Sequence, residues 1–332
     1  MTLDAVAKRA RVSTATVSRV LNNPGVVKES TRKRVLRAVE DLNYYPNLHA
    51  RSLAGGRSNS LGMIVSNIRN PFFVDIFVGM EQAARERGYE VLVENSDYQP
   101  AQLLASVGSM IGRRVSGLAL MVSEMDAGVM QEVVESDIPA VMYDVGAPGP
   151  KITNIRVRYE LGMRRIVEHL YTLGHRKMAF LGHHSSLAPL ETRKRSFEDS
   201  VGRYGSEVEH VAVLNDDSLA GSMQAVHELF ESGFAPTAIV CVNDYMAIGA
   251  MRAVKARGLK VPDDISITGF DNIEFSEFTD PPLTTVDIPR TAIGRMAVEA
   301  LLGDGRERQG REIMIEPELL LRDSTGICRT AS

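Results

Sequence analysis

The chain has 332 residues, of which 44% are hydrophobic and 24% charged, which is ordinary for a globular protein and too long for one small domain. No stretch approaches the roughly 18 apolar residues that cross a membrane, and the N-terminus lacks the apolar core of a signal peptide, so we expect a cytoplasmic protein with no membrane partner. Residues 1–57 carry 11 Lys and Arg and 4 Asp and Glu, which gives this end a net charge of +7. Because the whole chain has a net charge of −4, residues 58–332 carry −11. A basic end followed by an acidic body is typical of a protein that binds a polyanion with one end.

Residues 2–22 predict two short helices around a tight corner at Arg11, with Ser13 capping the second helix. The inward positions are Leu3, Val6, Ala7 and Ala10 in the first helix and Val17, Val20 and Leu21 in the second. The outward positions of the second helix are Thr14, Ala15, Thr16, Ser18 and Arg19. A short, polar outer face of this kind suits a DNA recognition helix, and the alternative is a helical hairpin that merely packs on another domain.

A third amphipathic helix is predicted over residues 29–42, with basic residues on its outer face, and it ends before Pro46. Residues 47–57 then predict a short, basic helix that is marginal in water and ends at Gly55 and Gly56. Leu53 would be exposed on this helix, and one use for an exposed leucine is as a wedge in the DNA minor groove. A disordered linker is the alternative.

From Leu61 onward, strands alternate with helices, which predicts βαβ units and parallel sheets covered on both faces. The predicted strands are 61–66, 89–94, 117–122, 140–143, 178–181, 211–214, 238–242 and 265–268. The predicted helices are 71–87, 102–113, 129–135, 162–173, 193–204, 219–232, 245–257 and 295–302. We interpret the body as two similar α/β lobes with a ligand cleft at the carboxyl ends of the strands, and we expect the last helix to return to the first lobe.

Polar residues at these strand ends are candidates for ligand binding. Asp144 and Asp271 each follow a strand, and Arg193 opens a helix, so carboxylate acceptors and a guanidinium donor could meet hydroxyl groups. Phe72 and Phe73 could supply an apolar wall. Asn243 and Asp244 also follow a strand, but either could simply cap the next helix.

We find no pattern of catalytic or metal-binding residues. The chain has no phosphate-binding loop, no G-x-G-x-x-G after a strand and no nucleophile elbow, so we expect neither an enzyme nor a cofactor. His183 and His184 are adjacent after a strand and would point in opposite directions, so we expect no metal there. Cys241 and Cys328 lack the spacing of a redox or metal motif, and we expect free thiols.

The chain resembles the lactose/galactose-repressor (LacI/GalR) family of bacterial transcription regulators. In the head the resemblance rests on the ordered motifs Val6-Ala7, Val12-Ser13, Thr16 to Asn22, Thr31-Arg32, Leu42-Asn43-Tyr44, Pro46-Asn47 and Ala50 to Ala54. In the body it rests on Asn70 to Phe73, Gly174 to Lys177, Asn243 to Ala250, Gly269-Phe270-Asp271 and Pro282 to Thr285. It implies that the body resembles periplasmic sugar-binding proteins, dimerises and holds a small effector.

The resemblance also implies site residues. In DNA binding it adds Asn47, Ala50, Arg51 and Leu53 to the outer face of the second helix. For the effector it implicates Phe73, Met121, Ser123, Asp144, Arg193, Asn243 and Asp271. Four positions depart from the family pattern: Arg11 stands for a glycine, Lys28 for a serine cap, Arg158 for an aspartate, and Asp216 for an aromatic that stacks on the effector in several relatives.

The fold we predict is a small all-α helix-turn-helix headpiece followed by an α/β, periplasmic-binding-protein-like body of two doubly wound parallel-sheet lobes. The headpiece should span residues 1–46, a hinge helix and linker 47–58, and the effector-binding and dimerisation body 59–328. Lobe 1 should comprise about 60–157 and 289–318, and lobe 2 about 158–286 and 319–328.

The function we predict is a homodimeric repressor that binds a pseudo-palindromic DNA operator and is released by a small effector. The ligand could instead act as a co-repressor, or the chain could be a sugar-binding protein with a vestigial head. The tail, 323–332, lacks a leucine heptad, so we expect a dimer rather than a tetramer. Asp144, Asp216 and Asp271 without a stacking aromatic favour a sugar over a purine, unless Arg158 pairs with Asp216.

Overall fold

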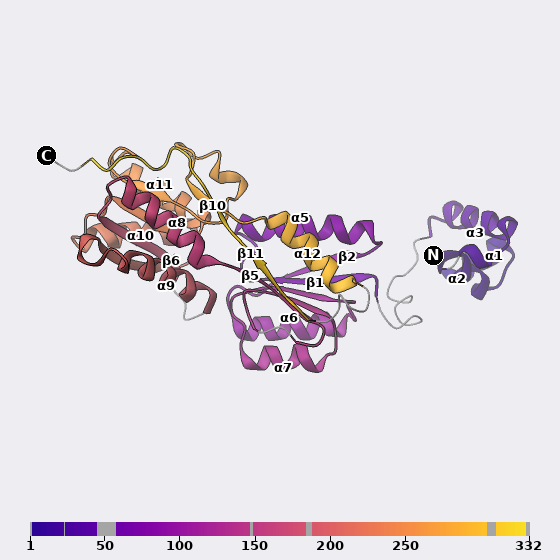
Figure 1. Cartoon of the computed structure of the whole chain (residues 1–332). Coiled ribbons are helices and arrows are strands. Elements are labelled where there is room, and N and C mark those ends of the chain that lie inside the picture. The colour runs from indigo at the N-terminus through magenta and orange to yellow at the C-terminus, as the bar shows by residue number, and fades with distance from the viewer. Residues whose placement is uncertain are drawn as a thin grey trace. The chain divides into compact units, whose positions relative to one another are not determined.

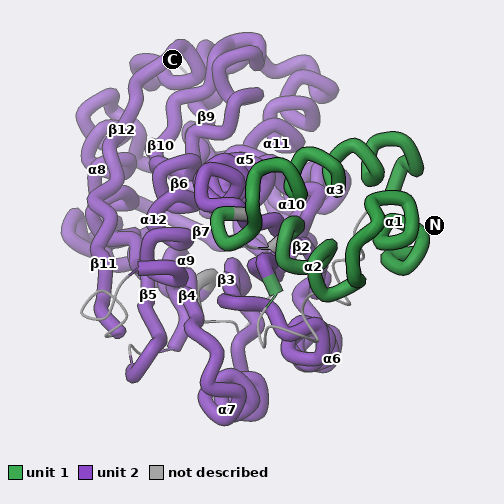
Figure 2. The backbone as a smooth tube through the Cα atoms, turned by 90° about the vertical axis from the view of Figure 1, so that its right-hand side faces the viewer, with its two compact units in different colours: residues 1–58 green, residues 59–332 purple. Residues whose placement is uncertain are grey.

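A computed structural model describes residues 2–22, 24–44, 58–146, 149–183, 188–303 and 310–329. It divides into two compact units, residues 1–58 and residues 59–332, which are coloured separately in Figure 2. The predicted hinge helix, with Asn47, Ala50, Arg51 and Leu53, lies outside the described residues. In the described part of the chain, no helix is both long and apolar enough to cross a bilayer.

The first unit is built on three helices: α1 (Leu3–Ala10), α2 (Thr14–Asn22) and α3 (Glu29–Asp41). Their core consists of the buried residues Val6, Ala7, Ala10, Val17, Val20, Val35 and Ala38. Arg11 adopts the left-handed conformation at the corner, with φ 54°, and this costs on the order of 1 kcal/mol for a residue with a Cβ. Ser13 Oγ accepts a hydrogen bond from the Thr16 amide at 3.2 Å, which confirms the predicted cap of α2.

Lobe 1 of the second unit is organised around a six-stranded sheet in the order β11-β5-β4-β3-β1-β2, with all neighbours parallel. Its strands are β1 (Ser60–Val65), β2 (Glu90–Asn95), β3 (Leu118–Met121), β4 (Ala140–Tyr143), β5 (Ile152–Val157) and β11 (Glu312–Ile315). Its helices are α5 (Pro71–Glu86), α6 (Pro100–Gly112), α7 (Ala127–Glu135) and α12 (Arg290–Leu302). Figure 1 shows α5 and α12 over one face of this sheet and α6 and α7 over the other.

Two glycines allow α5 and α12 to pack closely. A Cβ at Gly79 would lie 2.1 Å from the carbonyl oxygen of Thr291, and a Cβ at Gly294 would lie 2.1 Å from that of Ile76. Neither position accommodates a side chain unless the backbone moves. The last long helix thus returns to lobe 1, as predicted, although it begins at Arg290 rather than at residue 295.

Lobe 2 contains a four-stranded parallel sheet in the order β7-β6-β8-β9. Its strands are β6 (Lys177–His183), β7 (Glu209–Asn215), β8 (Ala238–Cys241) and β9 (Ser266–Thr268), and its helices are α8 (Tyr159–Thr172), α9 (Ala188–Gly202), α10 (Leu219–Glu231) and α11 (Asp244–Ala256). The strands β10 (Thr285–Asp287) and β12 (Glu318–Leu320) pair antiparallel beside it. Each lobe has the alternation of strand and helix that the sequence predicts.

Four strands were not predicted from the sequence: β5, β10, β11 and β12. The run of β5 contains Thr153 and Asn154, which are polar yet buried, so it lacks the continuous apolar character of a central strand. β11 and β12 are short and partly exposed. The chain passes between the lobes where β5 leads into α8, where β10 leads into α12, and where β11 leads into β12.

Candidate functional site

The outer face of α2 is the candidate DNA-contacting surface of the first unit. Thr14, Ala15 and Arg19 are exposed, whereas Thr16 and Ser18 are partly buried. The opposite face, with Val17 and Val20, is fully used in the core. No ion pair within the described residues engages Arg19, so its guanidinium is available to a phosphate or a base edge.

The second unit contains a cavity at the carboxyl ends of the strands of both lobes, with a volume of about 30 Å³. Residues of both lobes surround it: Asn70, Phe72, Phe73, Tyr98, Met121, Val122, Ser123 and Tyr143 from lobe 1, and Tyr159, Arg193, Asn243 and Asp271 from lobe 2. The structure therefore brings six of the predicted effector residues to one cavity: Phe73, Met121, Ser123, Arg193, Asn243 and Asp271.

Arg193 lies on α9 and is 7% exposed. One terminal nitrogen donates to Tyr159 Oη at 2.8 Å and the other donates to the Val242 carbonyl at 3.3 Å. The guanidinium also lies over the ring of Tyr159, 4.3 Å from its centroid. Its Nε has no hydrogen-bond partner among the described residues, so a buried donor remains available at the cavity.

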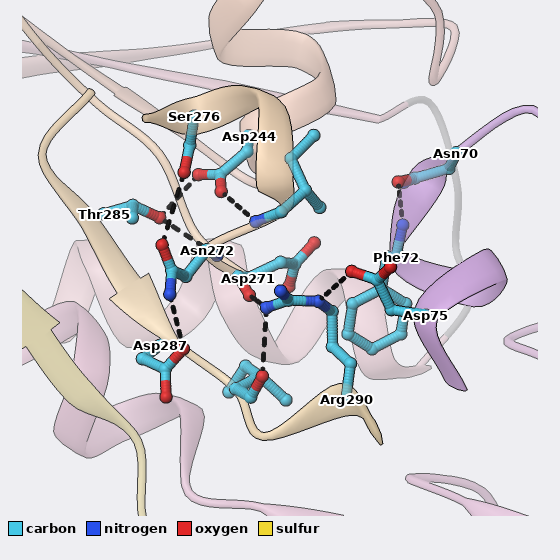
Figure 3. Close-up of polar contacts among 12 residues, drawn as sticks. Asn70, Phe72, Asp75, Asp244, Asp271, Asn272, Ser276, Thr285, Asp287 and Arg290 are labelled. Carbon is cyan, nitrogen blue, oxygen red and sulfur yellow. Dashed lines mark hydrogen bonds and ion pairs between the residues drawn. The ribbon is translucent and has the colours of Figure 1, made fainter. Parts of the chain in front are cut away.

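Asp271 is 2% exposed and is held through its main chain. Figure 3 shows Arg290 donating to the Asp271 carbonyl and, through Nε, to Asp75 on α5 at 2.7 Å. Asp271 Oδ1 is buried and has no partner within the described ranges. Burial raises the pKa of this carboxyl to about 7, and Arg193 and Arg290 limit that rise. A buried acceptor thus complements the buried donor of Arg193.

Asp144 does not line the cavity, contrary to the prediction. Its Oδ1 accepts from the Val157 amide at 2.8 Å, and its Oδ2 accepts from the hydroxyl of Tyr159. Desolvation raises its pKa to about 6, although these two hydrogen bonds oppose the rise. Asp144 therefore acts on the cavity through Tyr159, whose hydroxyl donates to Asp144 and accepts from Arg193.

Asp216 is likewise not among the residues that line the cavity, and its side chain is exposed. The next residue, Asp217, is the buried one, and it accepts hydrogen bonds from Asn67, Tyr98 and Asn243. The possible pairing of Arg158 with Asp216 is likewise wrong: Arg158 contacts Glu316 at 2.9 Å and Glu160 at 3.2 Å.

Asn243 serves as a cap as well as a lining residue. Its Oδ1 accepts from the Met246 amide at 2.8 Å at the start of α11. Asp244 is fully buried and accepts from Thr285 Oγ1 at 2.5 Å and from the Ile273 amide at 2.8 Å (Figure 3). Asp244 is thus committed to holding the segment that carries Asp271.

Sequence reasoning missed five cavity residues: Asn70, Tyr98, Val122, Tyr143 and Tyr159. Tyr98 and Tyr143 lie at or just after strand ends. The search for polar residues at strand ends that identified Asp271 could therefore have identified them. With Phe72 and Phe73 they surround the cavity with aromatic rings. The premise that the cleft lacks an aromatic face is therefore wrong.

Comparisons with known proteins cover both units. Residues 2–47 match the family described as bacterial regulatory proteins, lacI family, and residues 167–325 match the periplasmic binding protein-like domain. The chain is 33% identical to the HTH-type transcriptional repressor PurR of Photobacterium profundum, over 97% of this chain and 98% of that protein.

Solved structures are also similar to this protein over nearly the whole chain. The lac repressor dimer bound to operator and the anti-inducer ONPF has a TM-score of 0.85 and 32% identity, covering 98% of this chain and 99% of that one. A complex of the transcriptional regulator CelR with cellobiose has a TM-score of 0.71 and 25% identity, with the same coverage. By its two matched domains and its end-to-end identity to such a repressor, the chain belongs to the LacI family of bacterial regulatory proteins.

Proposed function

We propose that this protein is a sequence-specific, DNA-binding repressor of transcription whose operator affinity is controlled by a small effector. The observation that carries the proposal is the exposed, polar face of α2 on a basic headpiece, within a chain that matches a transcriptional repressor from end to end. Thr14, Ala15, Thr16, Ser18 and Arg19 would contact base edges in the major groove. The protein would act in the bacterial cytoplasm and would have a binding role rather than a catalytic one.

A homodimer is part of this proposal, because a pseudo-palindromic operator offers two equivalent half-sites. The lac repressor it resembles is described as a dimer on its operator. In the second unit, large apolar side chains are exposed on α5, at Val74 and Val78, and after β9, at Phe275 and Phe278. Phe278 is 76% exposed, which is unfavourable in a monomer and suits a surface that a second copy covers.

The effector would bind in the cavity between the lobes, in contact with Phe73, Met121, Ser123, Arg193, Asn243 and Asp271. Arg193 offers an unpartnered donor and Asp271 an unpartnered acceptor. A hydroxyl group can both accept and donate, so a molecule with several hydroxyls satisfies both residues at once. We therefore propose a sugar or sugar derivative, and the similar CelR structure is a complex with cellobiose.

A planar base is the second candidate for the effector, because aromatic rings surround the cavity. The choice of ligand class leaves the DNA function unchanged. Release from the operator and enhanced binding to it are both compatible with an interlobe site, and we propose release. The rival role, a sugar-binding protein with a vestigial head, is disfavoured by the intact packing of the headpiece core.

A thermal-shift screen followed by an operator-binding assay tests the proposal. The screen would compare monosaccharides, disaccharides and purine bases with the full chain. We expect a sugar to raise the melting temperature of the parent but not that of Arg193→Met. The same sugar should change the affinity for operator DNA. Stabilisation by guanine or hypoxanthine alone would overturn the sugar assignment, and a stabilising ligand without any effect on DNA binding would overturn the regulatory role.

A further inference from the structure

Asp217 connects the two lobes of the second unit. It follows β7 in lobe 2 and is 7% exposed. Its carboxylate accepts from two residues of lobe 1: Tyr98 Oη at 2.7 Å and Asn67 Nδ2 at 3.2 Å. Asn67 Nδ2 also reaches the main-chain oxygen of Asp217 at 3.1 Å. From its own lobe, Asp217 accepts from Asn243 Nδ2 at 2.9 Å.

The donors are oriented for this role by their other contacts. Asn67 Oδ1 accepts from the Arg69 amide at 3.1 Å, and Asn243 Oδ1 accepts from the Met246 amide at 2.8 Å. Each side-chain amide must therefore turn its NH₂ group toward Asp217. The ring of Tyr98 also packs against His183, at the end of β6, with ring centroids 4.6 Å apart. Tyr98 is thus attached to lobe 2 at two points.

These contacts close the cavity. Tyr98 and Asn243 both line it, and its volume is about 30 Å³. A six-membered ring needs on the order of 150 Å³, as in an engineered cavity that binds benzene. A ligand of that size therefore fits only if lining side chains such as Tyr98 move or the lobes part, and parting the lobes breaks the hydrogen bonds from lobe 1 to Asp217.

We propose that Asp217 is the centre of an interlobe latch, formed with Asn67, Tyr98 and Asn243, which holds the cleft shut against ring-sized ligands. Asp217 is then a positioning residue rather than a ligand contact. Three side-chain donors converge on the Asp217 carboxyl group, two of them from lobe 1, so the latch favours the closed arrangement of the lobes. The consequence for the effector rests on the proposed function, whereas the closure of the lobes does not.

Because only open molecules can bind a ligand, the apparent affinity is the intrinsic affinity multiplied by the fraction of molecules that are open, and the latch keeps that fraction small. Breaking it should therefore strengthen binding, an effect that general damage to the fold would not produce. The chain supplies a matched control, because Asp216 is adjacent, has the same charge and is exposed. Tyr98→Phe removes one hydroxyl and keeps the ring against His183.

Electron paramagnetic resonance distance measurements on the full chain test the latch without any ligand. Spin labels would be attached at Glu132→Cys on α7 and Arg195→Cys on α9, both exposed positions on different lobes. Cys328 would be replaced by serine, and Cys241 is buried. Labelled chain would be diluted with excess unlabelled chain, so that only distances within one chain are recorded.

In the parent and in Asp216→Ala we expect a single distance between the two spin labels, which corresponds to the closed lobes and is shorter than the distance in open molecules. Asp217→Ala should increase the ratio of open to closed molecules at least tenfold, and Tyr98→Phe should increase it by a smaller factor. The double variant of Tyr98 and Asp217 should open no further than Asp217→Ala, because both changes remove the same contact. Unchanged distances in Tyr98→Phe and Asp217→Ala would overturn the latch. If Asp217→Ala does not fold, the spin-label distances of Tyr98→Phe alone test the latch, and unchanged distances in that variant would overturn it. A parent that shows the short distance but binds no operator would refute the proposed function and leave the latch standing.

Discussion

Asp271→Asn should stabilise the protein in the absence of ligand, and it should do so more at pH 8 than at pH 5. The pKa of Asp271 is raised by burial from 3.8 to about 7, and the residue is 2% exposed. At pH values between 3.8 and about 7, Asp271 keeps its proton in the folded chain and has lost it in the unfolded chain. The free energy of unfolding therefore falls as the pH rises through this window.

The magnitude follows from the shift. Each pKa unit corresponds to about 1.4 kcal/mol, so ionised Asp271 costs the folded state about 4 kcal/mol when the pH is above the folded value. Roughly 2–3 kcal/mol of this cost is added between pH 5 and pH 8. Asparagine has nearly the same shape and no charge, so Asp271→Asn removes the cost. The difference in melting temperature between variant and parent should grow by roughly 5–10 °C across the same range.

Thermal and urea denaturation of parent and variant at pH 5 and pH 8 measure this effect. Asp144, whose pKa is raised to about 6 by burial, adds a pH dependence that both proteins share. The difference between the two proteins therefore isolates Asp271. A difference that stays constant with pH, or a variant that is less stable than the parent at pH 8, would refute the argument that Asp271 is a destabilising charge kept for ligand binding.

The remaining predictions concern DNA, response and packing. Arg19→Ala should weaken operator binding by about 1–3 kcal/mol in a mobility-shift assay if its guanidinium reads a base, and parental affinity would rule that contact out. Operator affinity should fall steeply with salt concentration, and a flat response would argue against phosphate contacts by the basic headpiece. Arg193→Met should keep operator affinity and lose the response to effector, because Arg193 lies at the cavity; a variant released at the parent's effector concentration would exclude it as a contact. Gly294→Ala should destabilise lobe 1 by about 1–3 kcal/mol in urea denaturation. The control Gly112→Ala, whose new Cβ would have no neighbour within 4 Å, should be nearly neutral. Equal stabilities of the two variants would contradict the close packing of α5 and α12.

The alternation of strands and helices was predictable because it depends on local periodicity. The cap at Ser13 and the tight corner at Arg11 were predictable for the same reason, since each depends on a few adjacent residues. β5 was missed because it carries Thr153 and Asn154, whose burial becomes understandable only when the neighbouring strands are known.

The site was predictable only in part. Strand ends identified Asp271 and Asn243, but the spacing could not say which of two adjacent aspartates turns inward. The structure buries Asp217 and exposes Asp216, and it uses Asp217 to hold Tyr98 from a distant part of the chain. Such contacts depend on how the two lobes close, which no local pattern in the sequence encodes.

Selection of DNA from a random-sequence pool by the full chain tests the central claim most directly. The selected sequences would then be compared with scrambled versions in a mobility-shift assay, with and without a ligand found by thermal shift. We expect one pseudo-palindromic sequence to be enriched, to bind far more tightly than its scrambled version, and to lose affinity when the ligand is added. Equal affinity for selected and scrambled DNA would contradict the assignment of this protein as a ligand-controlled repressor.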